Sequence, residues 1–301
     1  MTGDRKATHF FTVDVEEHFH VSAFEGIVRR EQWDEQPSRV ERNVDRLLEL
    51  LAHHDALATF FIVGWVARRQ PTLVRRIADA GHEIASHSYW HRRVNLLPPE
   101  VFRADIRECK QVLEDAVGRP VYGFRAPSFS IRPGTEWAFD VLLEEGHRYD
   151  SSLFPIKRPD YGYPAASPEP HLIKRESGTL LEVPMATTSF GSLRLPAAGG
   201  GYLRHFPLAI IRRALREHAR RGIPAMTYIH PWEIDPDQPR FQVPLLTRLR
   251  HYRGLGHTFA RLDKLMAGAR FTSVAKYFDI PALALGADGQ TDRRTDGKVL
   301  S

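Results

Sequence analysis

The chain has 301 residues, of which 42% are hydrophobic and 26% charged, a composition typical of a globular protein with a sizeable core in one or two domains. Its net charge of +5 comes largely from arginine pairs spread along helix-like stretches, and without one basic stripe that carries aromatic residues we expect no nucleic-acid binding. The single cysteine excludes a disulfide framework within the chain, and no apolar run is long enough for a transmembrane segment.

The predicted elements alternate between strands and helices along the chain. The first are a short strand over 10–15 and a helix over 38–52, with Ser38 as its N-cap. They are followed by a strand over 58–63, a helix over 72–80, a strand over 83–86, a helix over 98–117, a strand over 121–124, a helix over 136–145, a strand near 149, a helix over 207–221 and a strand over 225–229. This order predicts an α/β fold in which helices cover a parallel sheet.

Residues with catalytic or metal-binding side chains follow the ends of these strands. They are Asp14, Glu16, His87, Arg125, Asp150 and His230. Parallel (β/α) barrels carry their active sites at the carboxyl ends of the strands, where the loops meet over one opening. The sequence therefore predicts a barrel with one active site at this end.

Two regions depart from the alternation. Residues 154–206 are rich in proline and tyrosine and predict an irregular insertion with a hairpin, in which the glycines 199–201 allow either a flexible turn or a close approach of backbone to a ligand. Residues 286–301 predict a disordered tail, so a single catalytic domain is expected over 1–285. The first residues lack the apolar core of a signal peptide, which predicts a cytoplasmic protein.

Asp14 and Glu16 lie two positions apart in a strand, so both side chains point to the same side of the sheet. Neighbouring carboxylates repel each other unless a cation lies between them. His87 and His91 have a spacing that suits two ligands of one metal ion. Two histidines and a carboxylate can bind a divalent metal and leave positions open for water and substrate, which indicates metal-assisted hydrolysis.

Taken together, these motifs resemble the polysaccharide deacetylases of the NodB-homology family, carbohydrate esterase family 4. The motifs are Thr12-Val-Asp14-Val-Glu16-Glu17, His87-Ser-x-x-His91, Arg125-Ala-Pro127, Tyr149-Asp150-Ser-Ser and Ile229-His230-Pro-Trp232. Further segments are similar to the subgroup found with exopolysaccharide and exosortase gene clusters; they are Gly199-Gly-Gly201-Tyr202-Leu-Arg204, His230-Pro-Trp-Glu233-Ile-Asp235 and Arg250-His-Tyr252-Arg253-Gly254-Leu-Gly256.

The resemblance implies a distorted (β/α) barrel of about seven parallel strands and a divalent metal, most often Zn²⁺. In that family two histidines and one carboxylate bind the metal, and His87 and His91 match the histidines. Many members carry two adjacent aspartates, but here Val15 follows Asp14. Some relatives have Asp-x-Asp, which makes Glu16 the expected metal carboxylate, with Glu17 as the alternative.

The same resemblance implies roles for four further residues. Asp14 matches the base that takes a proton from the attacking water, and Arg125 matches the arginine that pairs with this base. His230 matches the acid that protonates the leaving amine, and Asp150 matches the aspartate that orients this histidine. Glu233 is expected only to end the loop that follows His230.

The expected function is that of a metal-dependent hydrolase that removes N-acetyl groups from amino-sugar units of a polysaccharide or its lipid-linked precursor. Two alternatives stay open: a C–N hydrolase of small amides, similar to allantoinase, and a catalytically silent glycan-binding module. The expected partner is an N-acetylated glycan or a lipid-linked oligosaccharide, met through peripheral contact with the inner face of the membrane. The oligomeric state does not follow from the sequence.

Overall fold

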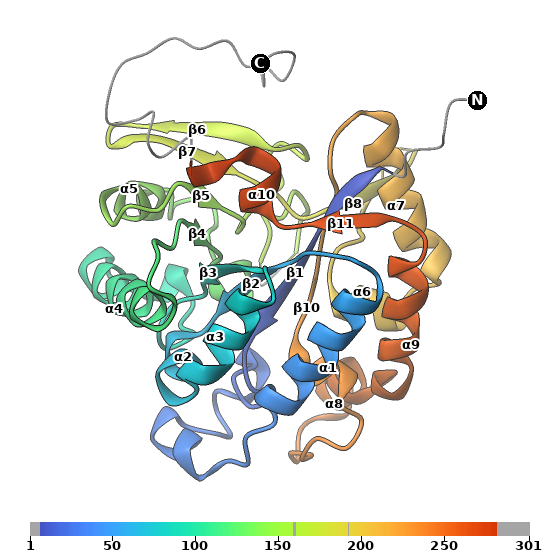
Figure 1. Cartoon of the computed structure of the whole chain (residues 1–301), viewed down its shortest axis with the longest axis horizontal. Coiled ribbons are helices and arrows are strands. Elements are labelled where there is room, and N and C mark those ends of the chain that lie inside the picture. Colours follow the sequence, from blue (N-terminus) through green and yellow to red (C-terminus); the bar gives the residue numbers. More distant parts are fainter. Residues whose placement is uncertain (1–6, 159–160, 192, 282–301) are drawn as a thin grey trace.

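A computed structural model describes residues 7–158, 161–191 and 193–281 of the chain (Figure 1). The tail predicted over 286–301 lies outside these residues. Among the helices of the described part, none is both long and apolar enough to cross a lipid bilayer.

A nine-stranded, mostly parallel sheet forms the centre of the fold. The strands are β1 (Thr8–Val15), β2 (Thr59–Ile62), β3 (Glu83–Ser86), β4 (Gly123–Phe124), β5 (Tyr149–Asp150), β6 (His171–Arg175), β7 (Gly178–Glu182), β10 (Met226–Ile229) and β11 (Arg270–Thr272). Their order is β10-β1-β2-β3-β4-β5-β7-β6, with β11 also paired to β1. Among the described strands of this sheet, β6 and β7 form the one antiparallel pair and all other pairs are parallel, so the predicted α/β fold is confirmed.

The sheet curves into a distorted barrel whose two sides meet near β10. Strands β1–β5, β7 and β10 run parallel to one another around it. After β7 the chain crosses to the other side of the sheet, where the amide of Ala186 donates a hydrogen bond of 3.1 Å to the carbonyl of Met226 in β10. This bond closes the gap that the strand pairing leaves open.

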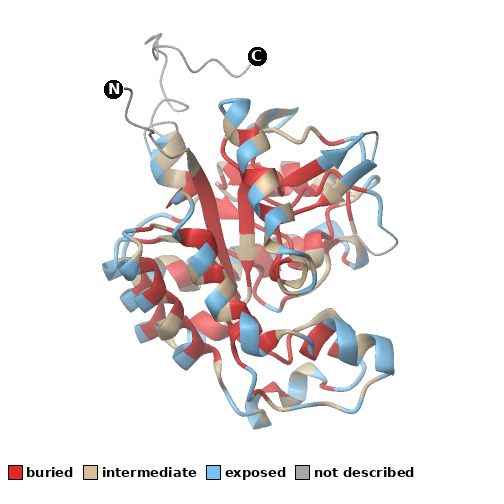
Figure 2. Cartoon of the chain, turned by 90° about the vertical axis from the view of Figure 1, so that its right-hand side faces the viewer, coloured by how far each residue is buried: buried red, intermediate tan, exposed pale blue. Residues whose placement is uncertain are grey.

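Helices surround the strands on the outside (Figure 1). They are α1 (Val40–His53), α2 (Gly64–Arg69), α3 (Pro71–Asp79), α4 (Pro99–Val117), α5 (Trp137–Glu144), α6 (Gly200–His205), α7 (Leu208–Arg220), α8 (Leu245–Tyr252), α9 (Leu255–Met266) and α10 (Val274–Phe278). Figure 2 shows buried strands at the centre and helices whose outer faces are exposed. The amphipathic patterns in the sequence thus place the core between sheet and helices.

The start of α1 differs from the prediction. Ser38 does not cap the helix; its hydroxyl donates a hydrogen bond of 2.5 Å to the carboxylate of Glu17. That same carboxylate accepts hydrogen bonds from the amides of Arg39 and Val40 at the first turn. A carboxylate satisfies the free N–H groups of a helix start and interacts favourably with the helix dipole, so Glu17 acts as a cap supplied by the preceding loop.

Residues 154–206 contain regular structure. The hairpin β6–β7 extends the main sheet, because β7 pairs in parallel with β5. A second hairpin, β8 (Thr187–Phe190) with β9 (Leu193–Pro196), forms a small separate sheet before α6. This interval therefore completes one side of the barrel and leads the chain back toward the site.

Two buried carboxyl groups face each other where β5 and β7 end. Asp150 and Glu182 lie in register, and both are fully buried. Asp150 accepts a hydrogen bond of 2.6 Å from the hydroxyl of Ser152, and Glu182 accepts one from the amide of Leu153. Burial raises the pKa of Asp150; burial, and then the nearby charge of Asp150, raise the pKa of Glu182 well above its ordinary value. The pair therefore retains a proton at a pH where exposed carboxyl groups have lost theirs.

This pair predicts a loss of stability as the pH rises. Because the folded-state pKa of Glu182 is raised, its contribution to stability is complete below the pKa of the unfolded chain, about 4.3, and is lost as the pH rises toward the folded-state pKa. Glu182→Gln removes this dependence, so the free energy of unfolding of the variant should improve relative to that of wild type as the pH rises above about 5. Urea unfolding across pH 5–9 measures the difference.

Glu176→Gln is the matched control, because Glu176 is an exposed carboxylate on the same hairpin. A constant difference between wild type and Glu182→Gln over this pH range would contradict a shared proton.

Candidate active site

The carboxyl ends of three strands bring several of the predicted site residues together. Asp14 lies near the end of β1 and Glu16 directly after it, His87 follows β3, and His230 follows β10. They line one cavity of about 410 Å³. Its wall also includes the aromatic side chains of Phe129, Tyr161, Tyr228 and Trp232. The site therefore lies where the alternation of strands and helices predicts it.

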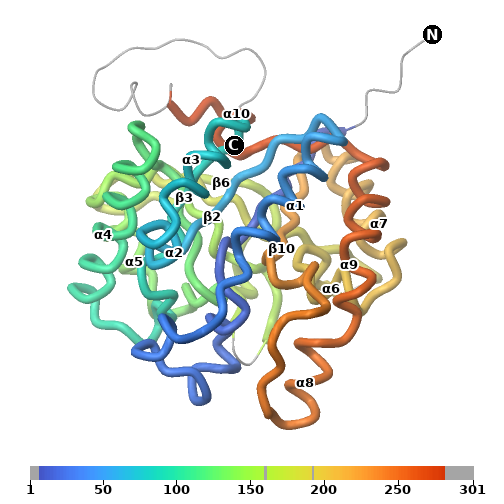
Figure 3. The backbone as a smooth tube through the Cα atoms, turned by 60° about the horizontal axis from the view of Figure 1, so that its bottom comes forward, coloured from blue at the N-terminus to red at the C-terminus, as the bar shows by residue number. Residues whose placement is uncertain are grey.

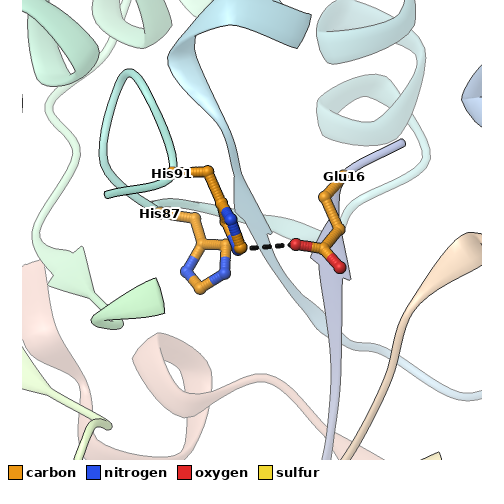
Figure 4. A group of neighbouring side chains, drawn as sticks. All are labelled: Glu16, His87 and His91. Carbon is orange, nitrogen blue, oxygen red and sulfur yellow. Dashed lines mark ion pairs between the residues drawn. The ribbon is translucent and has the colours of Figure 1, made fainter. Parts of the chain in front are cut away.

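Glu16, His87 and His91 form a compact set of metal ligands (Figure 4). Their ligand atoms lie within 4.8 Å of one another, and Nε2 of His91 is 2.6 Å from a carboxylate oxygen of Glu16. Nδ1 of His87 lies 2.8 Å from the carbonyl oxygen of Arg125, to which it can donate, leaving Nε2 free for a cation. All three side chains are buried.

The charges of this set also suit a cation. Burial lowers the pKa of His87 to about 4, so its imidazole is neutral and can act as a ligand at neutral pH. Burial alone would raise the pKa of Glu16, but the nearby charges of His91 and His230 outweigh burial and hold that pKa well below its ordinary value. Two imidazole nitrogens and a carboxylate are a ligand set that zinc binds, so the residues present fit such an ion.

The loop that carries His87 and His91 is anchored by hydrogen bonds to a side chain of α4. Ser88 and His91 have positive φ angles of 65° and 51°, a backbone conformation that few residues other than glycine adopt. The buried carboxylate of Asp105 accepts hydrogen bonds from the amides of Tyr89 (2.8 Å) and Trp90 (3.1 Å). The sequence contains a signal for Asp105, since a carboxylate interrupts the apolar face of a helix there, but we did not predict its contact with the loop.

Arg125 organises the other side of the site. It is fully buried, and its guanidinium donates to Asp14 Oδ1 at 2.6 Å and to the hydroxyl of Thr12 at 2.8 Å. Further hydrogen bonds reach the carbonyl and the hydroxyl of Ser151. The other oxygen of Asp14 lies 3.9 Å from Nε2 of His230, so it faces the imidazole and the cavity.

The carboxylate that contacts His230 is Glu233, not Asp150. Nδ1 of His230 lies 3.1 Å from Oε2 of Glu233, which also accepts a hydrogen bond from the backbone amide of His230. Asp150 instead accepts a hydrogen bond from Ser152 and lies beside Glu182. The resemblance assigns the orienting role to Asp150, whereas the geometry assigns it to the glutamate three residues after the histidine.

Glu233 is itself fixed by the segment that contains α6. Arg204 forms an ion pair of 3.0 Å with it, and both side chains are buried. Gly200 packs so closely against this carboxylate that any side chain there would collide with it. Within the glycine run that was predicted to form a turn or to approach a ligand, Gly200 therefore makes room for Glu233, and Gly199 makes room for Tyr228. Trp232, which directly precedes Glu233, donates its indole N–H to the carboxylate of Glu16 at 3.0 Å.

Comparison with known proteins is consistent with this geometry. Residues 32–139 match the family model described as polysaccharide deacetylase, and residues 151–279 match a domain of unknown function, DUF3473. The chain is 35% identical over 103 residues to a peptidoglycan-N-acetylglucosamine deacetylase of Bacillus cereus, covering 34% of this chain and 46% of that protein. It is 34% identical over 71 residues to a chitooligosaccharide deacetylase of Rhizobium leguminosarum bv. trifolii, covering 24% of this chain and 33% of that protein.

The chain thus spans less than half the length of these relatives. The family match and the relatives show that part of the chain is similar to polysaccharide deacetylases. Among solved structures, a provisionally assigned polysaccharide deacetylase from Mycobacterium smegmatis superposes with a TM-score of 0.60 at 20% identity, covering 99% of this chain and 97% of that one. Puue allantoinase gives a TM-score of 0.60 at 17% identity, covering 95% and 92%. These two likenesses show a shared fold.

The adjacent glutamates allow a sharp test of the metal set. Glu16→Gln removes a ligand and should weaken Zn²⁺ binding at least about tenfold, while Glu17→Gln should leave zinc affinity unchanged and lower stability by about 1 kcal/mol through the weakened helix cap. Competition with a chromogenic chelator gives the affinity, and urea unfolding gives the stability. The assignment fails if Glu17→Gln loses zinc and Glu16→Gln retains it.

Proposed function

We propose that this chain is a metal-dependent hydrolase that removes N-acetyl groups from amino-sugar units of a polysaccharide or its lipid-linked precursor and releases acetate. One observation carries the proposal. A carboxylate held by a buried arginine, a histidine held by a buried glutamate and a three-residue metal set all face the same cavity. Amide hydrolysis needs a base, an acid and charge stabilisation at one place, and this cavity has residues for each.

Glu16, His87 and His91 would hold the cation, for which we propose Zn²⁺. When bound, such an ion polarises the amide carbonyl and lowers the pKa of water. The hydrogen bond from His87 to the carbonyl of Arg125 and the indole N–H donated to Glu16 keep two of these ligands in place. The site is therefore held by contacts that do not depend on the substrate.

Asp14 is the proposed general base. Arg125 occupies one of its carboxylate oxygens, while the second faces His230 across the cavity. The paired guanidinium fixes the orientation of the carboxylate, so that its second oxygen is placed to accept a proton from a water molecule in the cavity. Because Arg125 also bonds Thr12 and Ser151, its own position does not depend on Asp14 alone.

His230 is the proposed general acid. Burial alone would lower the pKa of its imidazole, but the carboxylates of Glu16, Glu233 and Asp14 outweigh burial and raise the pKa to about 9. The imidazole is then protonated at neutral pH and can donate a proton to the nitrogen of the leaving amine, which leaves poorly without it. Glu233 holds the ring through Nδ1 so that Nε2 faces the cavity.

The substrate class rests on the relatives and on the shape of the site. Two relatives act on N-acetylated amino-sugar polymers, as their names state. Aromatic rings of the kind that pack against sugar faces line the cavity beside the ligand set. We propose that the glycan belongs to exopolysaccharide biosynthesis. The reason is that the segments that contain Arg204 and Glu233 resemble the subgroup found with exopolysaccharide gene clusters.

Acetate release tests the reaction. The zinc-loaded protein should release acetate from N-acetylglucosamine oligomers, and Asp14→Asn should lower kcat by about 10² to 10⁴, the usual contribution of a general base. Asp34→Asn provides the control, since Asp34 is an exposed carboxylate.

Zinc binding without acetate release would overturn the deacetylase proposal. Opening of allantoin would then favour a small-amide hydrolase, and oligomer binding without any turnover would favour a glycan-binding module.

The role of Glu233 predicts a change in pH dependence. Glu233→Gln removes one of the carboxylates that raise the pKa of His230, so the alkaline limb of the kcat profile should move to lower pH, and kcat at pH 8.5 should fall about 10- to 100-fold with little change in KM. Asp150→Asn should leave the alkaline limb of the kcat profile at the same pH as in wild type, because this carboxyl group does not contact His230. A shift in Asp150→Asn but not in Glu233→Gln would restore the role that the resemblance gives to Asp150.

A further inference from the structure

Helix α8 exposes three leucines on one side. Leu245, Leu246 and Leu249 are 66%, 59% and 47% exposed, whereas His251 and Tyr252 at the end of the helix are buried. At about 100° per residue, the three leucines span about 100° of the helix circumference. Large apolar side chains gathered on one exposed turn mark an interaction surface rather than a core face.

Arginines flank this apolar strip. By the same geometry Arg248 lies on one side of the leucines and Arg250 on the other, and both are exposed. The chain has no acidic residue between Asp237 and Asp263. Within residues 7–158, 161–191 and 193–281, neither arginine forms an ion pair with a carboxylate. The strip is therefore both apolar and positively charged.

The strip adjoins the catalytic cavity. Tyr252 packs in a cluster with Phe24 and Trp232. Trp232 lines the cavity and bonds Glu16. Figures 1 and 3 show α8 projecting at the end of the molecule where the 16–39 loop also lies, beyond the carboxyl ends of the strands. Ile27, in that loop, is a further exposed apolar side chain, at 43%.

A lipid surface fits this strip better than a second copy of the chain. A symmetric dimer through α8 would place Arg248 and Arg250 against their own copies, and like charges repel. An anionic bilayer offers phosphates to the arginines, at about 1 kcal/mol for each basic residue near the surface, and an apolar interior to protruding leucines.

We propose that α8 docks the protein on an anionic membrane. Leu245, Leu246 and Leu249 insert at the boundary between headgroups and acyl chains, and Arg248 and Arg250 contact phosphates. The opening of the cavity beside Trp232 then faces the bilayer, where a lipid-linked glycan would be presented. Docking itself does not require that the proposed function be correct.

Vesicle sedimentation tests the proposal with the full chain. Wild type should sediment with vesicles of equal phosphatidylglycerol and phosphatidylcholine, and bind phosphatidylcholine vesicles at least tenfold more weakly. Binding should also weaken as salt is raised, because screening reduces the attraction. The triple variant Leu245→Ser, Leu246→Ser, Leu249→Ser and the double variant Arg248→Glu, Arg250→Glu should each lose at least tenfold in affinity for the anionic vesicles.

The matched control is the double variant Leu172→Ser, Leu193→Ser. These two leucines are 51% and 59% exposed and lie in β6 and β9, away from α8 in the sequence. The control should bind vesicles like wild type, and thermal melting checks that all variants are folded. The proposal is overturned if wild type does not sediment, which would leave a protein partner for α8, or if the control and the triple variant bind alike. Acetate release from soluble oligomers by the triple variant reports separately on the proposed function.

Discussion

The buried ion pair between Arg125 and Asp14 is the interaction on which the end of the barrel that carries the candidate site depends. A fully buried guanidinium is costly unless its charge and its N–H groups are all satisfied. Here the partners come from β1 and from the residue that follows β5, while Arg125 itself follows β4. Its charge can be satisfied only when these strands are in register, so one side chain links strand order to the orientation of the proposed base.

Much of the architecture was predictable because the signals are local and repeated. Buried strands alternate with amphipathic helices, and acidic residues, histidines or an arginine lie at or after the ends of several strands. A parallel sheet brings such positions to one edge whatever the loops between them do. For that reason Asp14, His87 and His230 could be placed at one site without knowledge of any contact between them.

The partners of these residues were less predictable, because pairing depends on three-dimensional distance. Asp150 stands at a strand end and matches a family motif, yet β7 brings Glu182 beside it and its carboxylate accepts a hydrogen bond from Ser152. Glu233 lies only three residues after His230, whose imidazole it contacts. A carboxylate at this spacing is common at the start of a helix, so the sequence alone does not single it out. Only its burial against Arg204 and Gly200 distinguishes it.

Consecutive carboxylates after β1 serve different parts of the molecule, and this constrains how related chains can change in length. Glu16 points to the metal set and Glu17 to the start of α1. Deleting or inserting one residue before them would exchange the two side chains, since neighbouring positions of an extended strand face opposite ways. Insertions and deletions are therefore expected to gather after Glu17, in the loop that leads to α1, while the spacing from β1 to Glu17 stays constant.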